Sequence, residues 1–139
     1  MAIIFHTIET SFSLKGKRQI SKWIKREIES NSRTVGAINI ILCSDEYLLE
    51  INKKHLTHDF YTDIITFNYN SESLISGDLY ISVDRVFENA SKFDDNFYTE
   101  LRRVIIHGIL HLLGNEDNSP ELKERIHAME DLALKRFPV

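Results

Sequence analysis

A nearly continuous apolar segment, VGAINIILC at residues 35–43, restricts the fold of this chain more than any other feature. Its length and its β-branched residues are typical of a strand in a sheet that is covered on both faces. A second β-branched segment, AIIFHTIE, occupies residues 2–9. Between the two segments, apolar residues recur at roughly helical spacing: Leu14, Ile20, Trp23, Ile24 and Ile28. The chain is therefore predicted to begin with a strand–helix–strand unit, with Ser13 as the N-cap of the helix.

The rest of the chain continues this pattern of strands and helices. Ser44 and Asp45 signal the start of a short helix. Two strands are predicted around a polar hairpin loop, at 63–69 and 77–83. Three helices are predicted after them, at about 84–93, 96–113 and 118–136. Because no linker or internal repeat interrupts these elements, residues 1–139 are predicted to form one domain of the α/β (α+β) class.

The composition excludes several classes of protein. A chain of 139 residues can bury a core without a disulfide or a structural metal. The one cysteine, Cys43, lies inside an apolar segment, so no disulfide partner is expected. Residues 1–10 lack the features of a secretion signal, and no apolar stretch is long enough to span a membrane. We therefore expect a cytoplasmic protein with no membrane partner.

The charge distribution leaves room for a local contact with nucleic acid. The formal net charge of −4 argues against a protein that coats nucleic acid through its overall charge. Basic residues nevertheless cluster in the first predicted helix and just before it: Lys15, Lys17, Arg18, Lys22, Lys25 and Arg26. These residues form either a site that binds RNA or an ordinary solvated helix face.

The segment HGILHLLGNED carries the clearest chemical signal. Residues four apart lie on the same face of a helix, so His107 and His111 can hold one metal ion between them. Gly114 is expected to end the helix, because glycine readily adopts the left-handed conformation found there. The reversed chain can then bring Asp117 back toward the ion, with the adjacent Glu116 as the competing ligand. The alternative interpretation is that the two histidines bind no metal and are ordinary surface residues or hydrogen-bonded core residues.

The spacing His-x-x-x-His-x-x-Gly-x-x-Asp is similar to that of the metzincin zinc proteases, with a carboxylate in place of their third histidine. Gly108 stands where those enzymes have a glutamate, and it is expected to let a substrate or another backbone approach closely. Three protein ligands leave a fourth position for water, which is typical of catalytic zinc. Zinc lowers the pKa of that water to about 7. The same ligand set also suits iron, nickel or cobalt.

Three motifs together resemble the YbeY family of bacterial rRNA maturation factors: TDIITF at 62–67, GDLYIS at 77–82 and HGILHLLG at 107–114. The resemblance extends over nearly the whole chain. It implies a small mixed sheet of about four strands packed by about five helices. It also implies a single-strand-specific, zinc-dependent endoribonuclease that acts in 16S rRNA 3′-end maturation and ribosome quality control, with the 30S subunit or its rRNA as partner.

The chain departs from the pattern of this family at two positions. By motif matching, His107 and His111 correspond to the first two zinc ligands, and Asp117 stands where most members have a third histidine. Most members also have an arginine before the TD motif, and the aligned residue here is Leu56. Loss of this guanidinium should weaken stabilisation of the phosphodiester transition state. Neighbouring residues either replace its charge or are ordinary loop residues: Lys53, Lys54, His55 and His58.

Two aspartates in the strand motifs have two possible roles. Asp63 and Asp78 either orient a histidine ring through its free nitrogen or serve as a strand-start cap and a turn residue. The leading function is thus RNA cleavage at a metal site formed by His107, His111 and Asp117. The alternatives are a zinc metalloprotease-like hydrolase, which lacks a general base at Gly108, and a ribosome-binding assembly factor with little cleavage of its own.

Overall fold

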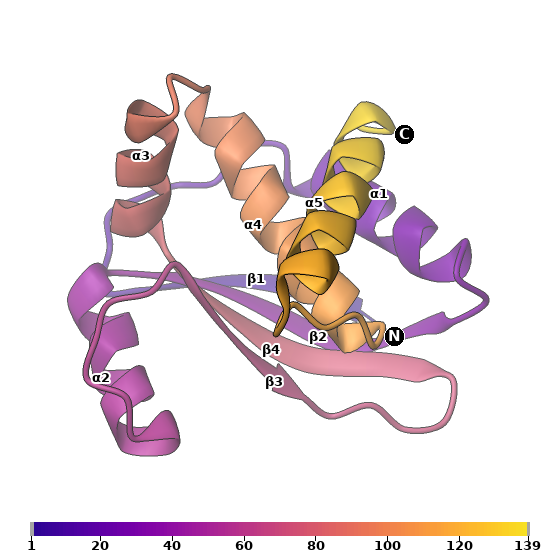
Figure 1. Ribbon diagram of the computed structural model, residues 1–139, viewed down its shortest axis with the longest axis horizontal. Coiled ribbons are helices and arrows are strands. Elements are labelled where there is room, and N and C mark those ends of the chain that lie inside the picture. Colours follow the sequence, from indigo (N-terminus) through magenta and orange to yellow (C-terminus); the bar gives the residue numbers. More distant parts are fainter. Residues whose placement is uncertain (1, 139) are drawn as a thin grey trace.

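Four strands form one mixed sheet in the spatial order β1-β2-β4-β3 in the computed structural model, which describes residues 2–138 (Figure 1). The strands are β1 (Ala2–Ile8), β2 (Thr34–Cys43), β3 (Ile64–Asn68) and β4 (Leu74–Ser82). β1, β2 and β4 are parallel, and β3 pairs antiparallel with β4. This arrangement confirms the predicted mixed sheet and its hairpin, and it leaves β3 as an edge strand.

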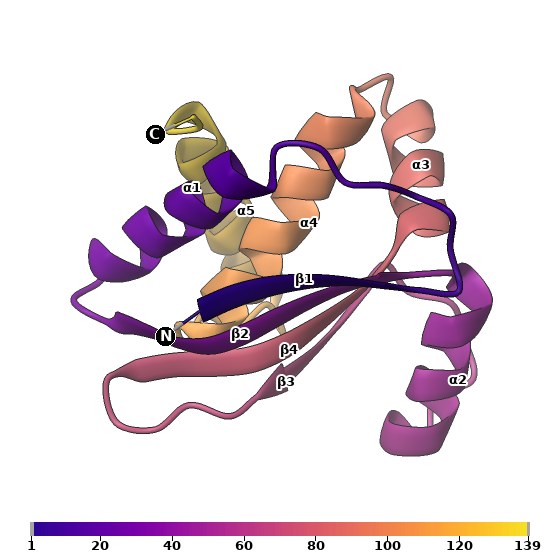
Figure 2. The ribbon, with the colours of Figure 1, turned by 180° about the vertical axis from the view of Figure 1, so that it is seen from behind.

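Residues 2–138 form five helices. They are α1 (Lys17–Glu29), α2 (Asp45–Leu56), α3 (Val83–Lys92), α4 (Phe97–Leu112) and α5 (Pro120–Lys135). Four of them pack on this sheet, and α5 packs on α4. Figures 1 and 2 show α1, α3, α4 and α5 above one face of the sheet, whereas α2 lies on the other side, at the end where β2 finishes. The predicted number and order of the helices are therefore confirmed.

The two faces of β2 differ in how well they are covered. Ile38, Ile40 and Leu42 are fully buried in the main core beneath the helices. On the opposite face, only the end of the strand is well covered, where Cys43 packs with Leu48 of α2 in a second small core. The prediction of a strand covered on both faces therefore holds only at this end, because α2 is the one helix on that side within residues 2–138.

The start of α1 differs from the prediction. Ser13 is not its N-cap: Gly16 occupies that position with φ +75°, and no side chain caps the helix. The preceding segment is held in another way, because buried Leu14 belongs to the main core and the N–H of Lys15 donates to the Tyr98 hydroxyl at 3.3 Å. Tertiary packing of this segment therefore delays the start of the helix.

α4 is the helix at the centre of the molecule, and α5 lies across it. Asn96 caps α4 by accepting N–H groups of Tyr98 and Thr99, and most of the residues after Glu100 are buried. α5 is attached to α1, because Trp23 Nε1 donates to the Ala133 carbonyl at 2.9 Å. No helix within residues 2–138 combines the length and the low polarity that a membrane span requires.

Candidate metal centre

His107, His111 and Asp117 converge at one point, as the sequence spacing predicts. One donor atom from each residue lies within 4.8 Å of the other two. The two Nε2 atoms are 3.0 Å apart, and Asp117 Oδ2 lies 3.4 Å from Nε2 of His107 and 3.5 Å from Nε2 of His111. All three side chains remain partly exposed, so solvent and substrate can reach them.

Local backbone geometry explains this convergence. Both histidines lie in the last turns of α4, which ends at Leu112. Gly114 follows with φ +101°, and its N–H donates to the His111 carbonyl at 3.0 Å. This left-handed residue ends the helix and reverses the chain. Ser119 then caps α5, so Asp117 lies in a short connection whose two ends are both fixed.

The three donor atoms fit a small divalent metal ion. Ligand distances of about 2.0–2.1 Å and tetrahedral angles place neighbouring donor atoms about 3.3 Å apart. The separations of 3.0, 3.4 and 3.5 Å bracket this value. Two imidazoles and one carboxylate are also a ligand set that zinc and other transition metals accept. The site can therefore hold such an ion without rearrangement of the backbone.

Glu130 on α5 is a member of this site that the sequence analysis missed. Its Oε2 lies 2.5 Å from His107 Nδ1, and its Oε1 accepts a hydrogen bond from Arg103 at 3.0 Å. The side chain is buried on the inner face of α5 with Ile126 and Ala133. A glutamate at a core position of an amphipathic helix was the signal that could have identified it, because buried carboxylates need partners.

The hydrogen bond to Glu130 determines which nitrogen of His107 can bind a metal. A carboxylate accepts a hydrogen, so Nδ1 carries the proton and Nε2 keeps its lone pair for the ion. Burial alone would lower the pKa of His107, but the hydrogen bond and charge of Glu130, with the charges of Asp117 and Asp63, outweigh it and raise the pKa. The metal-free site therefore holds a proton more firmly than an ordinary histidine does.

Asp63 lies near the site but does not have the expected contact with a ring nitrogen. It precedes β3 and lines the same cavity as His107 and His111. Burial raises the pKa of its carboxyl, and the nearby His107 partly offsets this rise. The contact with His107 Nδ1 that was expected of an aspartate is made by Glu130 instead. Asp63 therefore contributes negative charge to the cavity rather than orienting a histidine.

Asp78 and Glu116 lie away from the metal ligands. Asp78 accepts a hydrogen bond from Asn39 Nδ2 at 3.0 Å, and Asn39 in turn pairs with His6 on the sheet face that α4 does not cover. The proposed role of Asp78 in orienting His107 or His111 is therefore wrong, since successive residues of a strand point to opposite faces. Glu116 is exposed and borders a separate hollow with Arg125. Within residues 2–138, it is not part of the convergent group.

Gly108 faces the protein interior rather than a substrate. A Cβ at this position would lie 2.8 Å from Ile64 Cδ1 and 2.8 Å from Leu79 Cδ2. The expected neighbour was a substrate or another backbone, but the side chains of Ile64 and Leu79 occupy this space, and the glycine lets α4 pack closely on β3 and β4. The same packing places His107 and His111 directly beside the edge strand.

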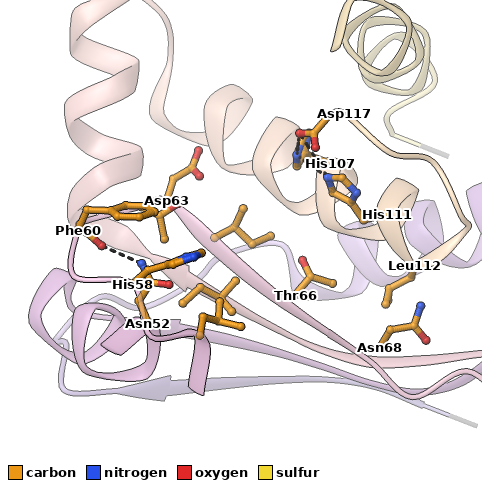
Figure 3. Close-up of a pocket in the computed structure, with 14 residues that line it drawn as sticks. Asn52, His58, Phe60, Asp63, Thr66, Asn68, His107, His111, Leu112 and Asp117 are labelled. Carbon is orange, nitrogen blue, oxygen red and sulfur yellow. Dashed lines mark hydrogen bonds and ion pairs between the residues drawn. The ribbon is translucent and has the colours of Figure 1, made fainter. Parts of the chain in front are cut away.

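A cavity of about 520 Å³ adjoins the metal ligands (Figure 3). This volume lies within the range of about 300–1,000 Å³ that is usual for ligand sites. His107, His111 and Asp117 lie at one side, and residues at the end of α2 and in the loop after it lie at the other. Leu56, where the family resemblance leads us to expect an arginine, is one of the lining residues.

The predicted basic contacts lie outside this cavity. Among the residues that the structure describes, no lysine or arginine lines it. Lys53 instead lies 3.7 Å from Glu50 and 3.6 Å from Asp59, and Lys54 is exposed. The basic side chains near and on α1 are also exposed, and three of them border a different hollow beside β1: Arg18, Lys22 and Lys25. Of the residues suggested as substitutes for the arginine, only His58 lines the cavity.

Known proteins resemble this chain over nearly its full length. A family model described as Endoribonuclease YbeY matches residues 5–138. Endoribonuclease YbeY of Parabacteroides distasonis is 44% identical over 138 residues, which cover 99% of this chain and 97% of that protein. Endoribonuclease YbeY of Bacteroides thetaiotaomicron is 44% identical over 134 residues, with coverages of 96% and 98%.

A solved structure has the same fold. The solution structure of TM1509 from Thermotoga maritima matches with a TM-score of 0.67 and 28% identity, and the match covers 98% of this chain and 91% of that one. The family model, the relatives and the solved structure thus each match nearly the full length of the chain. This agreement confirms the resemblance that was inferred from the strand and histidine motifs, and the chain belongs to the YbeY endoribonuclease family.

Proposed function

We propose that this protein is a zinc-dependent endoribonuclease that cuts single-stranded RNA, and that it acts in 16S rRNA 3′-end maturation and ribosome quality control. The observation that carries the proposal is the convergence of His107, His111 and Asp117 beside an open cavity, in a chain of the YbeY endoribonuclease family. The donor separations match those that a tetrahedral ion requires.

The residues around the ligands support hydrolysis at this position. Zinc with three protein ligands lowers the pKa of a water in its fourth position to about 7, which supplies a nucleophile at neutral pH. Glu130 keeps Nε2 of His107 free to bind. Asp117 offsets part of the positive charge of the ion, so the water should be less acidic than beside three histidines. Asp63 lines the cavity next to His107 and can accept a proton or orient water there.

A strand of RNA can reach the ligands along β3. β3 is the edge strand, and Ile64, Thr66 and Asn68 on one of its faces line the cavity. The cavity is open to solvent rather than enclosed, which suits an extended single strand whose bases are unpaired. With one phosphodiester beside His107 and His111, the nucleotides before and after it would extend in opposite directions along the cavity.

A ribosome-binding assembly factor with little cleavage of its own is the second candidate. Leu56 and the absence of lysine and arginine from the cavity lining within residues 2–138 favour it, because cations usually stabilise a cleaved phosphodiester. The exposed basic residues on α1 then supply the contact with rRNA. A metalloprotease has no comparable support, since Gly108 faces Ile64 and Leu79 where a general base would be needed.

Cleavage of single-stranded RNA by purified protein tests the leading proposal. We expect the protein to cleave single-stranded RNA in the presence of zinc and to leave the same sequence uncut when it is part of a perfect duplex. His107→Ala and His111→Ala should lose both zinc binding and cleavage. His6→Ala is the matched control, because His6 contacts Asn39 on the uncovered face of the sheet. Equal cleavage by His107→Ala and the unchanged protein would reject the proposed site. Zinc binding without any cleavage would favour the assembly factor.

Binding to 30S subunits tests the proposed partner. Charge reversal at Lys17, Arg18 and Lys22 should weaken binding and reduce its dependence on salt, because each lost phosphate contact removes one released counterion. Binding that is unchanged by these substitutions would assign the basic residues of α1 to an ordinary solvated surface.

A further inference from the structure

Phe60 lines the cavity from the side opposite the metal ligands (Figure 3). It is 56% exposed, although a phenylalanine ring is usually buried. Leu56, which lines the same wall, is 39% exposed. This wall therefore offers apolar surface to whatever enters the cavity, where a phosphate-binding site would offer positive charge.

The segment that carries Phe60 is fixed by the end of α2. Asn52 is only 2% exposed, and its Nδ2 donates to the Phe60 carbonyl at 2.8 Å. The carbonyl of Asn52 accepts the N–H of His58 at 3.1 Å. Thr57, which precedes His58, has φ +55° and turns the chain back toward Asn52. The buried side chain of Asn52 and its own carbonyl thus hold both ends of the segment 58–60, so the backbone that carries the ring is fixed by the fold.

The two aromatic rings that follow one another in this loop have different environments. Tyr61 is engaged elsewhere, because its hydroxyl donates to Glu46 at 2.9 Å and the Arg85 guanidinium lies 5.3 Å from its ring centre. Phe60 instead stacks on the His58 imidazole, with ring centres 5.1 Å apart and an angle of 21° between the planes. The imidazole covers part of one face of the phenyl ring, while more than half of Phe60 remains exposed.

We propose that Phe60, supported by His58, is a stacking platform for one unpaired base of the RNA strand whose phosphodiester lies at the metal ligands. The inference rests on the proposed function and names how that site holds its substrate. A base has a flat π surface whatever its identity, so stacking holds RNA without lysine or arginine and without sequence preference. A base inside a duplex is already stacked and paired, so the platform also selects single strands.

Substitutions at Phe60 test the platform by cleavage and by binding. Phe60→Ala and Phe60→Leu should weaken the binding of a short single-stranded RNA about 5- to 100-fold, the loss expected for one stacked base, whereas Phe60→Trp should retain it. Leucine keeps the apolar character of the residue without a π surface, so it separates stacking from simple burial. Phe93→Ala is the matched control, since Phe93 is 68% exposed at the end of α3 and does not line the cavity.

RNA with a single abasic nucleotide, placed at each position in turn, identifies the stacked base. At one position, the unchanged protein and Phe60→Ala should bind equally, because the partner of the ring is missing; at the others, the difference should persist. A fluorescent purine analogue at that position should be quenched by the unchanged protein and not by Phe60→Ala. A loss of affinity that is the same for every abasic substrate would overturn the platform.

The outcomes separate this inference from the proposed function. If the protein cleaves single-stranded RNA and Phe60→Ala binds as tightly as the unchanged protein, the platform is wrong and the nuclease stands. If the unchanged protein neither binds nor cleaves single-stranded RNA, the proposed function fails and the platform fails with it.

Discussion

Glu130 and His107 are joined by a 2.5 Å hydrogen bond between Oε2 and Nδ1, which connects α5 to the face of α4 that carries the candidate metal ligands. α5 is itself attached to α1, where Arg136 donates to both carboxylate oxygens of Glu27 at 2.8 and 2.7 Å. The orientation of one ligand therefore depends on packing between three helices. A site on rigid elements with a supported ligand is pre-organised for its ion.

Replacement of Glu130 by glutamine should weaken metal binding by about 10- to 100-fold while the fold is retained. Glutamine can still accept the hydrogen bond from Arg103, but its NH₂ group facing His107 would favour a lone pair on Nδ1 and a proton on Nε2, which blocks the metal. Competition with a chromophoric chelator measures the affinity. Asp131→Asn is the matched control, because Asp131 also pairs with Arg103, at 2.6 Å, without being in the metal site. Equal losses in both variants would contradict this account.

Metal affinity should fall as the pH decreases, and the fall should begin at a higher pH than it does for a site of ordinary histidines. Burial lowers the pKa of His107, but Glu130 and the nearby carboxylates raise it above 6.5 in balance. Protons therefore compete for Nε2 through this raised pKa. In the metal-free protein, the same shift stabilises the fold below pH 6.5, and this contribution is lost as the pH rises through the pKa of the folded state. Zinc titrations between about pH 5 and 8 test the prediction; a constant affinity across this range would refute it.

Introduction of an arginine at Leu56 should increase cleavage of single-stranded RNA by at least about tenfold. Leu56 lines the cavity and is 39% exposed, so a longer side chain can extend into the cavity without disturbing the core. A guanidinium there would stabilise negative charge that develops in the transition state. Initial rates at saturating RNA measure the gain, and Leu56→Met controls for side-chain length. No gain in Leu56→Arg would show that the cavity does not need a cation at this position.

Substitution of Gly108 by alanine should reduce the free energy of unfolding by up to about 2 kcal/mol. Alanine favours a helix over glycine by about 1 kcal/mol, but overpacking a core costs about 1–3 kcal/mol. Its Cβ would lie 2.8 Å from both Ile64 Cδ1 and Leu79 Cδ2. Urea denaturation measures the change. Ile64→Val removes one of the two clashing atoms. The loss caused by Gly108→Ala should therefore be smaller when it is measured relative to Ile64→Val than when it is measured relative to the unchanged protein. A larger loss in the Ile64→Val background would count against the packing argument.

The metal ligands illustrate what local rules can predict. His107 and His111 share a helix face because of the helical repeat, and Gly114 ends that helix because of its own conformational freedom. Both rules act over a few residues, and the structure follows them. The three residues of the candidate site were therefore predictable from one short segment. The hairpin and the number of helices followed from similar local patterns along the rest of the chain.

Long-range packing decided the surroundings of those ligands. The motif made Asp78 a candidate for orienting a histidine, but strand pairing places it on the uncovered face beside Asn39. Glu130 has no motif, and it reaches His107 only because α5 packs on α4. Phe60 likewise faces the cavity because buried Asn52 holds its backbone. The sequence alone determined the elements and the candidate metal ligands, since these follow from local geometry. Only the tertiary structure decided what supports the ligands and what surrounds the substrate, because those contacts depend on which distant faces bury one another.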